Sequence, residues 1–523
     1  MQRRAVVLEF VNLTGEAQLD PLGMRIAEEL TEGLIGTGYV VVPAAQKLPD
    51  GGLSRADVVS ELAASLSAGI VVSGEFLREG VGLRITCDVT DSATGLAAYT
   101  IEMISDSTEP GEALQEIHER VTGLMAMSFA NLSGVLGKTE PHEQLWTLSE
   151  PPRYAAFQEL EAGSEQFGFD YDRAREHFAR ALEIDPEFFR ADLLAALSYS
   201  HQGRHEEANR VVESWVARRD ELSEHDALWL AWQQAGLAGR EADQLRQMQL
   251  VTELNPRDHM ARYLMGYHAL RVNRPALAVE LLEQQPKASH DLAWRLNVLA
   301  EAHHLLGNYE QETEVSRLAY EQFSTPETLN GEARALGAMG NSEQIEAFLS
   351  RIDSDETSGP VGDLMLEIAF ELRAHGHRAE SLQIAERAAS WYETNGSEIR
   401  RALIAAERWE EALGLYRTLA EERPDRPGYL GQVGTLAART GDEKVARDIL
   451  ARLEQTKRPY SFGAETYWRA RIHALLDDRE QAVALLRQSF DEGQAFGIYS
   501  HQDIDLETLR GYAPFEDLMQ PQG

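Results

Sequence analysis

The beginning of the chain alternates between short apolar runs and amphipathic stretches of helical period. Apolar residues fill positions 5–10 and 39–42, whereas 19–34 and 55–66 place their apolar residues on one helical stripe. A short apolar run is typical of a buried strand, and the longer period is that of a helix with one buried face. The pattern therefore predicts two successive strand–helix steps.

A strand hairpin is predicted next, from apolar runs at 69–77 and 83–90. The residues between them include Gly80 and Gly82, and glycine readily adopts the positive φ angles that a hairpin turn requires. A further strand at 97–104 would continue the meander.

A helix at residues 110–131 would close this region. Four of its apolar residues share one stripe: Leu114, Ile117, Val121 and Leu124. Residues 1–131 are therefore predicted to form an α/β domain with a mixed sheet of about five strands.

The character of the sequence changes after a predicted linker at residues 132–152, which contains two glycines and three prolines. From Tyr154 onward the pattern is almost entirely helical. Ten anchor positions share one register, with successive spacings of 31 to 36 residues. The anchors are Ala174, Ala208, Gln244, Ala278, Glu312, Ile345, Ser381, Ala412, Ala446 and Ala482.

A turn is predicted five residues before each anchor after the first. Seven of these nine positions are Gly or Asn, types that tolerate the left-handed conformation in which many helices end. The positions are Gly203, Gly239, Asn273, Gly307, Gly340, Gly376, Glu407, Gly441 and Asp477. A period near 34 residues with a turn at fixed phase predicts about ten helix–turn–helix units over residues 153–490. Residues 491–523 would cap the last apolar face.

This register resembles the tetratricopeptide repeat family across about residues 154–490. The resemblance implies an all-α solenoid of paired helices, with a groove that holds peptides. Three units depart from the pattern, because Gln244, Glu312 and Ile345 stand where a small anchor is expected. We expect altered packing there, and also where Ser381 and Ala412 are about three residues too close.

Residues 5–15, 23–30, 69–76 and 88–95 look like the TolB-like N-terminal α/β domain. In bacteria that domain commonly precedes tetratricopeptide repeats in the C-terminal parts of serine/threonine kinases, adenylate cyclases and winged-helix transcription activators. The end of the chain, residues 509–518, is also similar to the end of such proteins. The resemblance implies a sensory or docking region and supplies no catalytic residues.

Composition limits the classes of partner. With 86 acidic and 49 basic residues, the formal net charge is −37, which would repel nucleic acids and anionic membranes. Cys87 is the only cysteine, so an internal disulfide and a cysteine-based zinc site are excluded. No apolar run is long enough to cross a membrane. The compartment stays open: Met1 either begins the protein or follows a removed leader, membrane helix or upstream domain.

Catalytic motifs are not found in the sequence. It has no kinase lysine, His-Arg-Asp or Asp-Phe-Gly motif and no phosphate-binding loop, and its Gly-x-Gly triplets at 36–38 and 80–82 lie in predicted turns. The histidine pairs 201/205, 303/304 and 375/377 straddle turns or diverge on a helix, so we expect no metal site. No cofactor is expected either.

Counting from the anchors places one set of side chains on the predicted groove. These partner-binding candidates are Trp229, Gln233, Tyr263, Tyr267, Asn297, Glu301, His304, Phe370, Tyr467 and Arg471. An aromatic groove with scattered polar groups suits an extended segment or a helix of a protein partner. The other interpretation of each aromatic residue is a place in the core between repeats.

We therefore expect a non-catalytic interaction or sensory module of a bacterial signalling protein. The groove would bind a protein or peptide, and the α/β domain would dock, dimerise or sense. Two alternatives are a free-standing assembly scaffold, periplasmic or cytoplasmic, and an enzyme with a site at the domain junction. The enzyme is disfavoured because no converging acid, base and nucleophile are visible.

Overall fold

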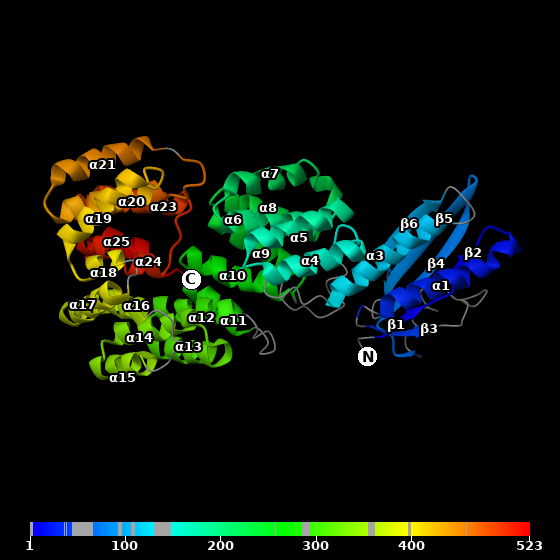
Figure 1. The fold of residues 1–523 in the computed structure, drawn as a ribbon, viewed down its shortest axis with the longest axis horizontal. Helices are drawn as coiled ribbons and strands as arrows, with labels where there is room; N and C mark the ends of the chain where they lie inside the picture. The colour runs from blue at the N-terminus through cyan, green and yellow to red at the C-terminus, as the bar shows by residue number, and fades with distance from the viewer. Residues whose placement is uncertain are drawn as a thin grey trace. The chain divides into compact units, whose positions relative to one another are not determined.

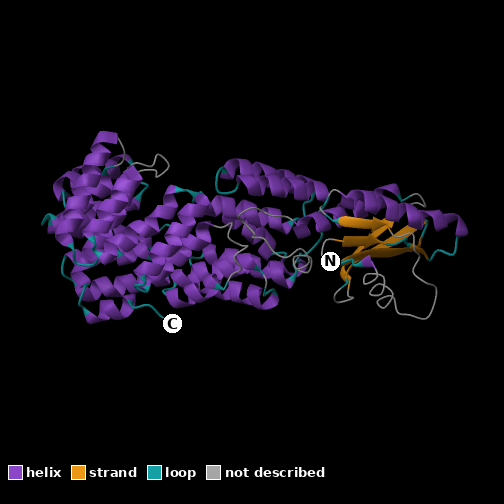
Figure 2. Ribbon diagram, turned by 90° about the horizontal axis from the view of Figure 1, so that it is seen from below, coloured by secondary structure: helices purple, strands orange, loops and turns teal. Residues whose placement is uncertain are grey.

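The computed structural model shows an α/β domain followed by a long helical array (Figures 1 and 2). The residues form two compact units, one of residues 1–234 and 250–260, the other of 235–249 and 261–523. The structure describes residues 4–35, 37, 39–43, 66–92, 97–105, 110–129, 148–256, 258–284, 293–353, 361–395, 399–456 and 458–522. The predicted helix at 55–66, its last residue apart, lies outside these ranges, as do Gly36 and Gly38.

The α/β domain contains a mixed sheet with the strand order β3-β1-β4-β5-β6, and the short β2 pairs with β4. Strand β1 is parallel to β3 and β4, whereas β4, β5 and β6 form an antiparallel meander. Gly80 has a φ of +58° in the tight turn between β4 and β5, as predicted for the hairpin. The bounds are β1 Arg4–Val7, β2 Val11–Asn12, β3 Val40–Pro43, β4 Ile70–Glu79, β5 Gly82–Asp91, β6 Ala97–Ser105, α1 Asp20–Ile35 and α3 Gly111–Phe129.

Helices α1 and α3 supply the core on one face of the sheet. All four residues of the predicted stripe on α3 are buried and share a cluster with Ile26 and Leu30 of α1 and with Val72 of β4. Alternate strand residues such as Val6 and Val71 are buried on the other face. The strands therefore read as continuous apolar runs because both of their faces are covered.

The α/β domain and the first helices of the array share this hydrophobic core. Helix α3 packs against α4, the first helix of the array. Arg120 of α3 donates to the carbonyl of Pro151 at 2.7 Å, and Arg153 pairs with Glu116 at 2.9 Å. A Cβ on Gly123 would lie 2.0 Å from the carbonyl oxygen of Pro152, so the close approach depends on glycine at this position.

Replacing Gly123 with alanine should therefore destabilise the first unit. Overpacking of this kind costs about 1–3 kcal/mol, more than the roughly 1 kcal/mol that alanine gains over glycine within a helix. Gly111→Ala on the same helix is the matched control, because a Cβ there would meet no atom within 4 Å. Urea unfolding should show a lower midpoint for G123A alone, and equal midpoints for the two variants would contradict this close packing.

The array consists, in the described residues, of ten helical hairpins. Each predicted anchor lies on the second helix of a hairpin and is buried. The bounds are α4 Tyr154–Gln166, α5 Tyr171–Ile184, α6 Phe189–His201, α7 His205–Val216, α8 Glu224–Leu237, α9 Glu241–Leu254, α10 His259–Arg271, α11 Pro275–Glu283, α12 Ala293–Leu305, α13 Tyr309–Phe323, α14 Asn330–Met339, α15 Ser342–Asp353, α16 Val361–Ala374, α17 Arg378–Asn395, α18 Arg400–Ala405, α19 Trp409–Glu422, α20 Pro427–Arg439, α21 Glu443–Gln455, α22 Ala464–Leu475 and α23 Arg479–Asp491.

All nine predicted turn positions have a left-handed backbone. Their φ angles lie between +57° and +86°, and they include Glu407 and Asp477, whose residue types did not indicate this conformation. The unusual anchors are accommodated individually. The side chain of Gln244 packs closely against Gly236, where a Cβ would lie 2.6 Å from the side-chain nitrogen of Gln244. Glu312 pairs with His304 and Arg334 in a buried charge network. The shortened unit has a first helix, α18, of only six residues.

Candidate functional site

The C-terminal segment, residues 494–522, lies along the first helices of the hairpins in the second unit. The amide of Phe496 donates to the carbonyl of Arg271 at the end of α10, and that of Gln522 donates to the carbonyl of Asn273. Thr508 donates to the carbonyl of Ala474 in α22. The sequence predicted that this segment caps the last apolar face, and its last helix does pack against α23. The rest of the segment extends well beyond that cap.

Three short helices give the C-terminal segment its shape. They are α24 Ile498–His501, the 3₁₀ helix η6 Ile504–Leu509 and α25 Ala513–Met519. Figure 1 shows α24 and α25 in red, at the C-terminal end of the colour range, and α25 contacts α23 whereas α24 contacts α12. Asp503 caps η6 by accepting from the amide of Asp505 at 2.9 Å, and Pro514 lies in the first turn of α25, where its missing amide proton is not needed.

Two arginines of the first helices hold the acidic end of η6. Arg439 of α20 pairs with Asp505 at 2.8 Å and donates to the carbonyl of Ile504 at 2.6 Å. Arg471 of α22 contacts Asp505 at 2.6 Å and Asp503 at 3.1 Å, and the hydroxyl of Tyr467 donates to Asp503 at 2.8 Å. Both aspartates are buried, so these pairs are shielded from water.

The electrostatics of this pair of arginines favour a charged Asp505. Burial raises the pKa of the Asp505 carboxyl, but the charges of Arg471 and Arg439 outweigh it and bring the pKa below its ordinary value. Burial raises the pKa of Tyr467 well above its usual range, so its phenol stays neutral and acts as a hydrogen-bond donor.

A second cluster joins the C-terminal segment to α12 and α16. Nε2 of His304 lies 3.1 Å from Oε1 of Glu371, and Nε2 of His375 lies 3.3 Å from Oε2 of the same carboxylate. His501, the last residue of α24, places its Nε2 3.8 Å from that Oε2. One donor atom from each of these four residues lies within 4.8 Å of the others. We call these four residues the histidine cluster.

Outer residues position the histidine cluster. Nδ1 of His304 lies 2.7 Å from Glu312, the unusual anchor, and Glu312 also pairs with Arg334 at 3.2 Å. Gln502 donates to Oε1 of Glu371 at 2.7 Å. The hydroxyl of Tyr309 lies 3.3 Å from Nε2 of His375. The anchor carboxylate thus replaces a small side chain because it orients a buried imidazole.

Charge states within the histidine cluster differ from one ring to the next. Burial lowers the pKa of His304, but Glu312 and Glu371 outweigh it and raise the pKa to about 9. Burial lowers the pKa of His501 to about 4, so this ring is neutral near pH 7. Burial raises the pKa of Glu371, but His304 and His375 bring it well below its ordinary value. A carboxylate and a neutral imidazole therefore face each other at the centre.

Four of the ten groove candidates contact the C-terminal segment. Glu301 accepts from the amide of Ile498 at 3.2 Å, and the ring of His304 packs edge-on against that of His501, with the ring centroids 5.4 Å apart. Tyr467 and Arg471 make the contacts with Asp503 and Asp505 given above. Four others belong to the same unit: Tyr263, Tyr267, Asn297 and Phe370. Tyr263 is buried and its ring stacks on Tyr267, while Phe370 is half-buried under the guanidinium of Arg401.

The remaining two candidates lie in the first unit and are buried there. Trp229 donates its indole proton to His225 at 3.3 Å, and Gln233 donates to Ser200 at 3.2 Å. Gln233 therefore joins α8 to α6 of the neighbouring hairpin, whereas Trp229 is bonded within its own helix.

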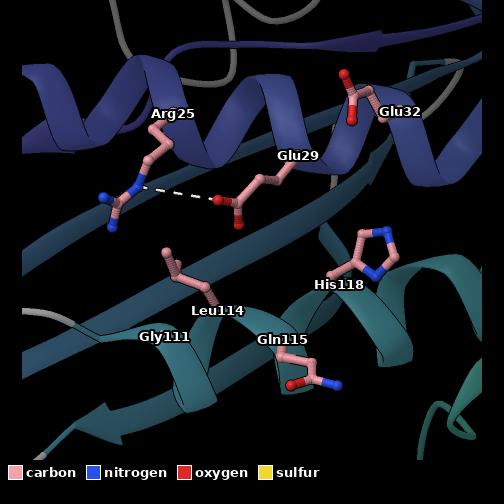
Figure 3. A pocket seen from close by; sticks show the side chains of 7 residues that line it. All are labelled: Arg25, Glu29, Glu32, Gly111, Leu114, Gln115 and His118. Carbon is pink, nitrogen blue, oxygen red and sulfur yellow. Dashed lines mark ion pairs between the residues drawn. The ribbon is translucent and has the colours of Figure 1, made fainter.

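The α/β domain has a hollow of its own, of about 640 Å³, between α1 and α3 (Figure 3). Its lining is mostly polar, and Arg25 pairs with Glu29 across one turn of α1 at 3.8 Å. Glu32 and His118 project from the two facing helices. The sequence pointed to no site at this position, because its residues come from segments far apart in the chain.

The histidine cluster was also missed. Pairs of histidines close in the sequence do not indicate this cluster, because the four residues come from α12, the end of α16 and the C-terminal segment. One signal was present in the sequence: Glu312 stands at an anchor position that is normally small, and a carboxylate there needs a buried partner. That partner is His304, one of the groove candidates.

Comparisons with known proteins identify the repeats. A family model described as tetratricopeptide repeat matches residues 163–229. No curated protein matches the chain. The TolB-like resemblance of the α/β domain has no matching family model.

Solved structures with a similar arrangement include a tetratricopeptide repeat protein from Parabacteroides merdae, with 15% identity and a TM-score of 0.33 over 48% of this chain and 99% of that one. Another is a human IFIT1 dimer with m7Gppp-AAAA, with 12% identity and a TM-score of 0.34 over 68% of this chain and 80% of that one. A third is the Cut9-Hcn1 hetero-tetramer of APC/C, with 11% identity and a TM-score of 0.27 over 68% and 77% of the two chains. Similarity at this level says nothing about what this chain binds.

Within the described residues, no helix is both long and apolar enough to cross a membrane. The chain combines an N-terminal mixed-sheet domain with an all-α tetratricopeptide-repeat array, and such repeats indicate a scaffold for protein partners.

Proposed function

We propose that this chain is a non-catalytic interaction module of a bacterial signalling protein, and that it binds acidic protein segments along the first helices of its hairpins. One observation carries the proposal: a polypeptide segment, the chain's own C-terminal segment, already lies on this surface. Its binding uses backbone hydrogen bonds together with arginine–carboxylate pairs, which is chemistry that a partner segment can reproduce.

The chemistry of the C-terminal segment suggests what such a partner carries. Asp503 and Asp505 reach Arg471 and Arg439, and Glu507 pairs with Arg373 of α16 at 2.7 Å. Acidic residues at every second position thus face a row of arginines on the first helices. A partner with the same spacing would compete with the segment, and the α/β domain would dock, dimerise or sense.

Photo-crosslinking tests this proposal in the native host. A benzophenone amino acid placed at Trp294 or Phe370 on first helices should give discrete adducts with one partner protein. The matched controls are Leu318 and Leu415, which are exposed on the second helices α13 and α19. Absence of adducts at the first-helix positions, or equal adducts at the controls, would count against this surface as the binding site.

A further inference from the structure

Several buried polar atoms of the histidine cluster lack a well-directed hydrogen bond. Among the described residues these include Nε2 of His304, Oε2 of Glu371 and Nε2 of His501. Their contacts with one another and with His375, at 3.1 to 3.8 Å, are ion pairs without hydrogen-bond geometry. His304 and Glu371 are at most 1% exposed. Leaving such groups unsatisfied is costly, so three of them at one point indicate a missing ligand.

The donor set identifies the class of that ligand. Three imidazoles and one carboxylate are typical zinc ligands, and the fold offers no cysteine among them. Four ligands at about 2.0–2.1 Å from zinc in a tetrahedron are about 3.3–3.4 Å apart. Nε2 of His304 lies 3.1 Å from Oε1 of Glu371, and Nε2 of His375 and of His501 lie 3.3 and 3.8 Å from Oε2. One donor atom of each residue lies within 4.8 Å of the others. A contraction of side chains would therefore complete the tetrahedron.

The surrounding residues have the roles that outer residues have at zinc sites. Glu312 contacts the second ring nitrogen of His304, which fixes the ring and leaves Nε2 for a cation. Gln502 occupies Oε1 of Glu371, which leaves Oε2 for a single bond to the cation. The 3.3 Å contact between Tyr309 and Nε2 of His375 is long enough for a cation to replace it.

We propose that His304, Glu371, His375 and His501 form a closed zinc site that fastens the C-terminal segment to the helical hairpins. Three ligands come from α12 and the end of α16, and the fourth comes from the segment. Bound zinc stabilises the state in which the segment covers the first helices. The metal site stands on its own geometry, whereas its effect on partner binding rests on the proposed function.

Metal binding to the full-length chain tests the site directly. After treatment with a chelator, the protein is titrated with Zn²⁺ against a chromophoric zinc indicator. One equivalent should bind tightly, and Co²⁺ should give the intense visible absorption of a tetrahedral complex. His501→Ala should weaken Zn²⁺ binding by at least about 100-fold, since a whole ligand is lost rather than an outer residue. His473→Ala is the matched control, because His473 pairs with Asp478 outside the cluster.

The coupling to the segment has a separate readout. Hydrogen exchange of residues 494–522 should slow when Zn²⁺ is added to the unaltered chain and to H473A, and should not respond in H501A. Failure of the unaltered chain to bind one equivalent would overturn the zinc site, as would equal affinities of H501A and H473A. Tight binding without a change in exchange would overturn the fastening role. None of these results depends on finding a protein partner, so they do not decide the proposed function.

Discussion

Arg471→Ala should release the C-terminal segment from the first helices. The substitution leaves Asp503 without its arginine and Asp505 with Arg439 alone, although both carboxylates are buried. Removing one partner of a buried charge pair costs about 3–5 kcal/mol, because the other charge stays desolvated. Hydrogen exchange of residues 494–522 should therefore become fast in R471A, while exchange in the α/β domain stays unchanged.

An exposed arginine provides the control for this prediction. Arg479 pairs with Asp477 at 3.0 Å, but their side chains are 48% and 80% exposed. Such surface pairs contribute about 0–1 kcal/mol, so R479A should leave the segment protected. Arg471→Lys should give an intermediate result, since it keeps the charge but loses the planar fork that contacts both aspartates. Unchanged protection in R471A would mean that the other contacts of the segment, such as Arg439 with Asp505 and Arg373 with Glu507, hold it without Arg471.

The repeat array could be predicted from the sequence because its rules are local. A small buried anchor, a turn five residues earlier and a period near 34 residues each follow from the packing of two adjacent helices. The position of a residue within the repeat predicted the left-handed turn better than its residue type did. Glu407 adopts a left-handed conformation that its side chain does not favour, because the helices on both sides fix the turn.

The candidate site could be predicted only in part, because it depends on contacts between distant segments. Counting along the helices found Glu301, His304, Tyr467 and Arg471, which all lie on the first helices. No local pattern shows that residues 494–522 cover them. Periodicity also cannot distinguish an aromatic residue that faces the groove from one packed between repeats. Trp229, for example, was a groove candidate but is buried.

The first unit contains a buried carboxylate, Asp226, that depends on nearby positive charge. Asp226 of α8 is 2% exposed and accepts from the amide and the hydroxyl of Ser149 at 2.8 and 2.7 Å. Arg190 lies 3.4 Å away and His225 3.6 Å away. Burial raises the pKa of Asp226, but Arg190 and His225 lower it by more, so the pKa falls below its ordinary value of 3.8.

The sign of the pH dependence follows from that lowered pKa. The unfolded chain binds a proton at Asp226 more readily than the folded chain, so the carboxylate stabilises the fold above about pH 4 and this contribution is lost as the pH falls through the folded pKa. Asp226→Asn should lower the free energy of unfolding near pH 7 by about 3–5 kcal/mol, because the buried Arg190 loses the carboxylate charge that it faces. The free energy of unfolding of D226N should also fall less steeply than that of the unaltered chain as the pH is lowered.

Urea unfolding followed by pulse proteolysis, with mass spectrometry of peptides from α6 and α8, measures the first unit separately from the second. The control is Asp220→Asn, which makes the same charge change at an exposed position and should follow the unaltered chain at every pH. If D226N lost stability on acidification as steeply as the unaltered chain, other carboxylates would have to supply the acid sensitivity. If D226N were as stable as the unaltered chain at pH 7, the charge of Asp226 would contribute nothing to stability, and its contact with Ser149 would depend on hydrogen bonding alone.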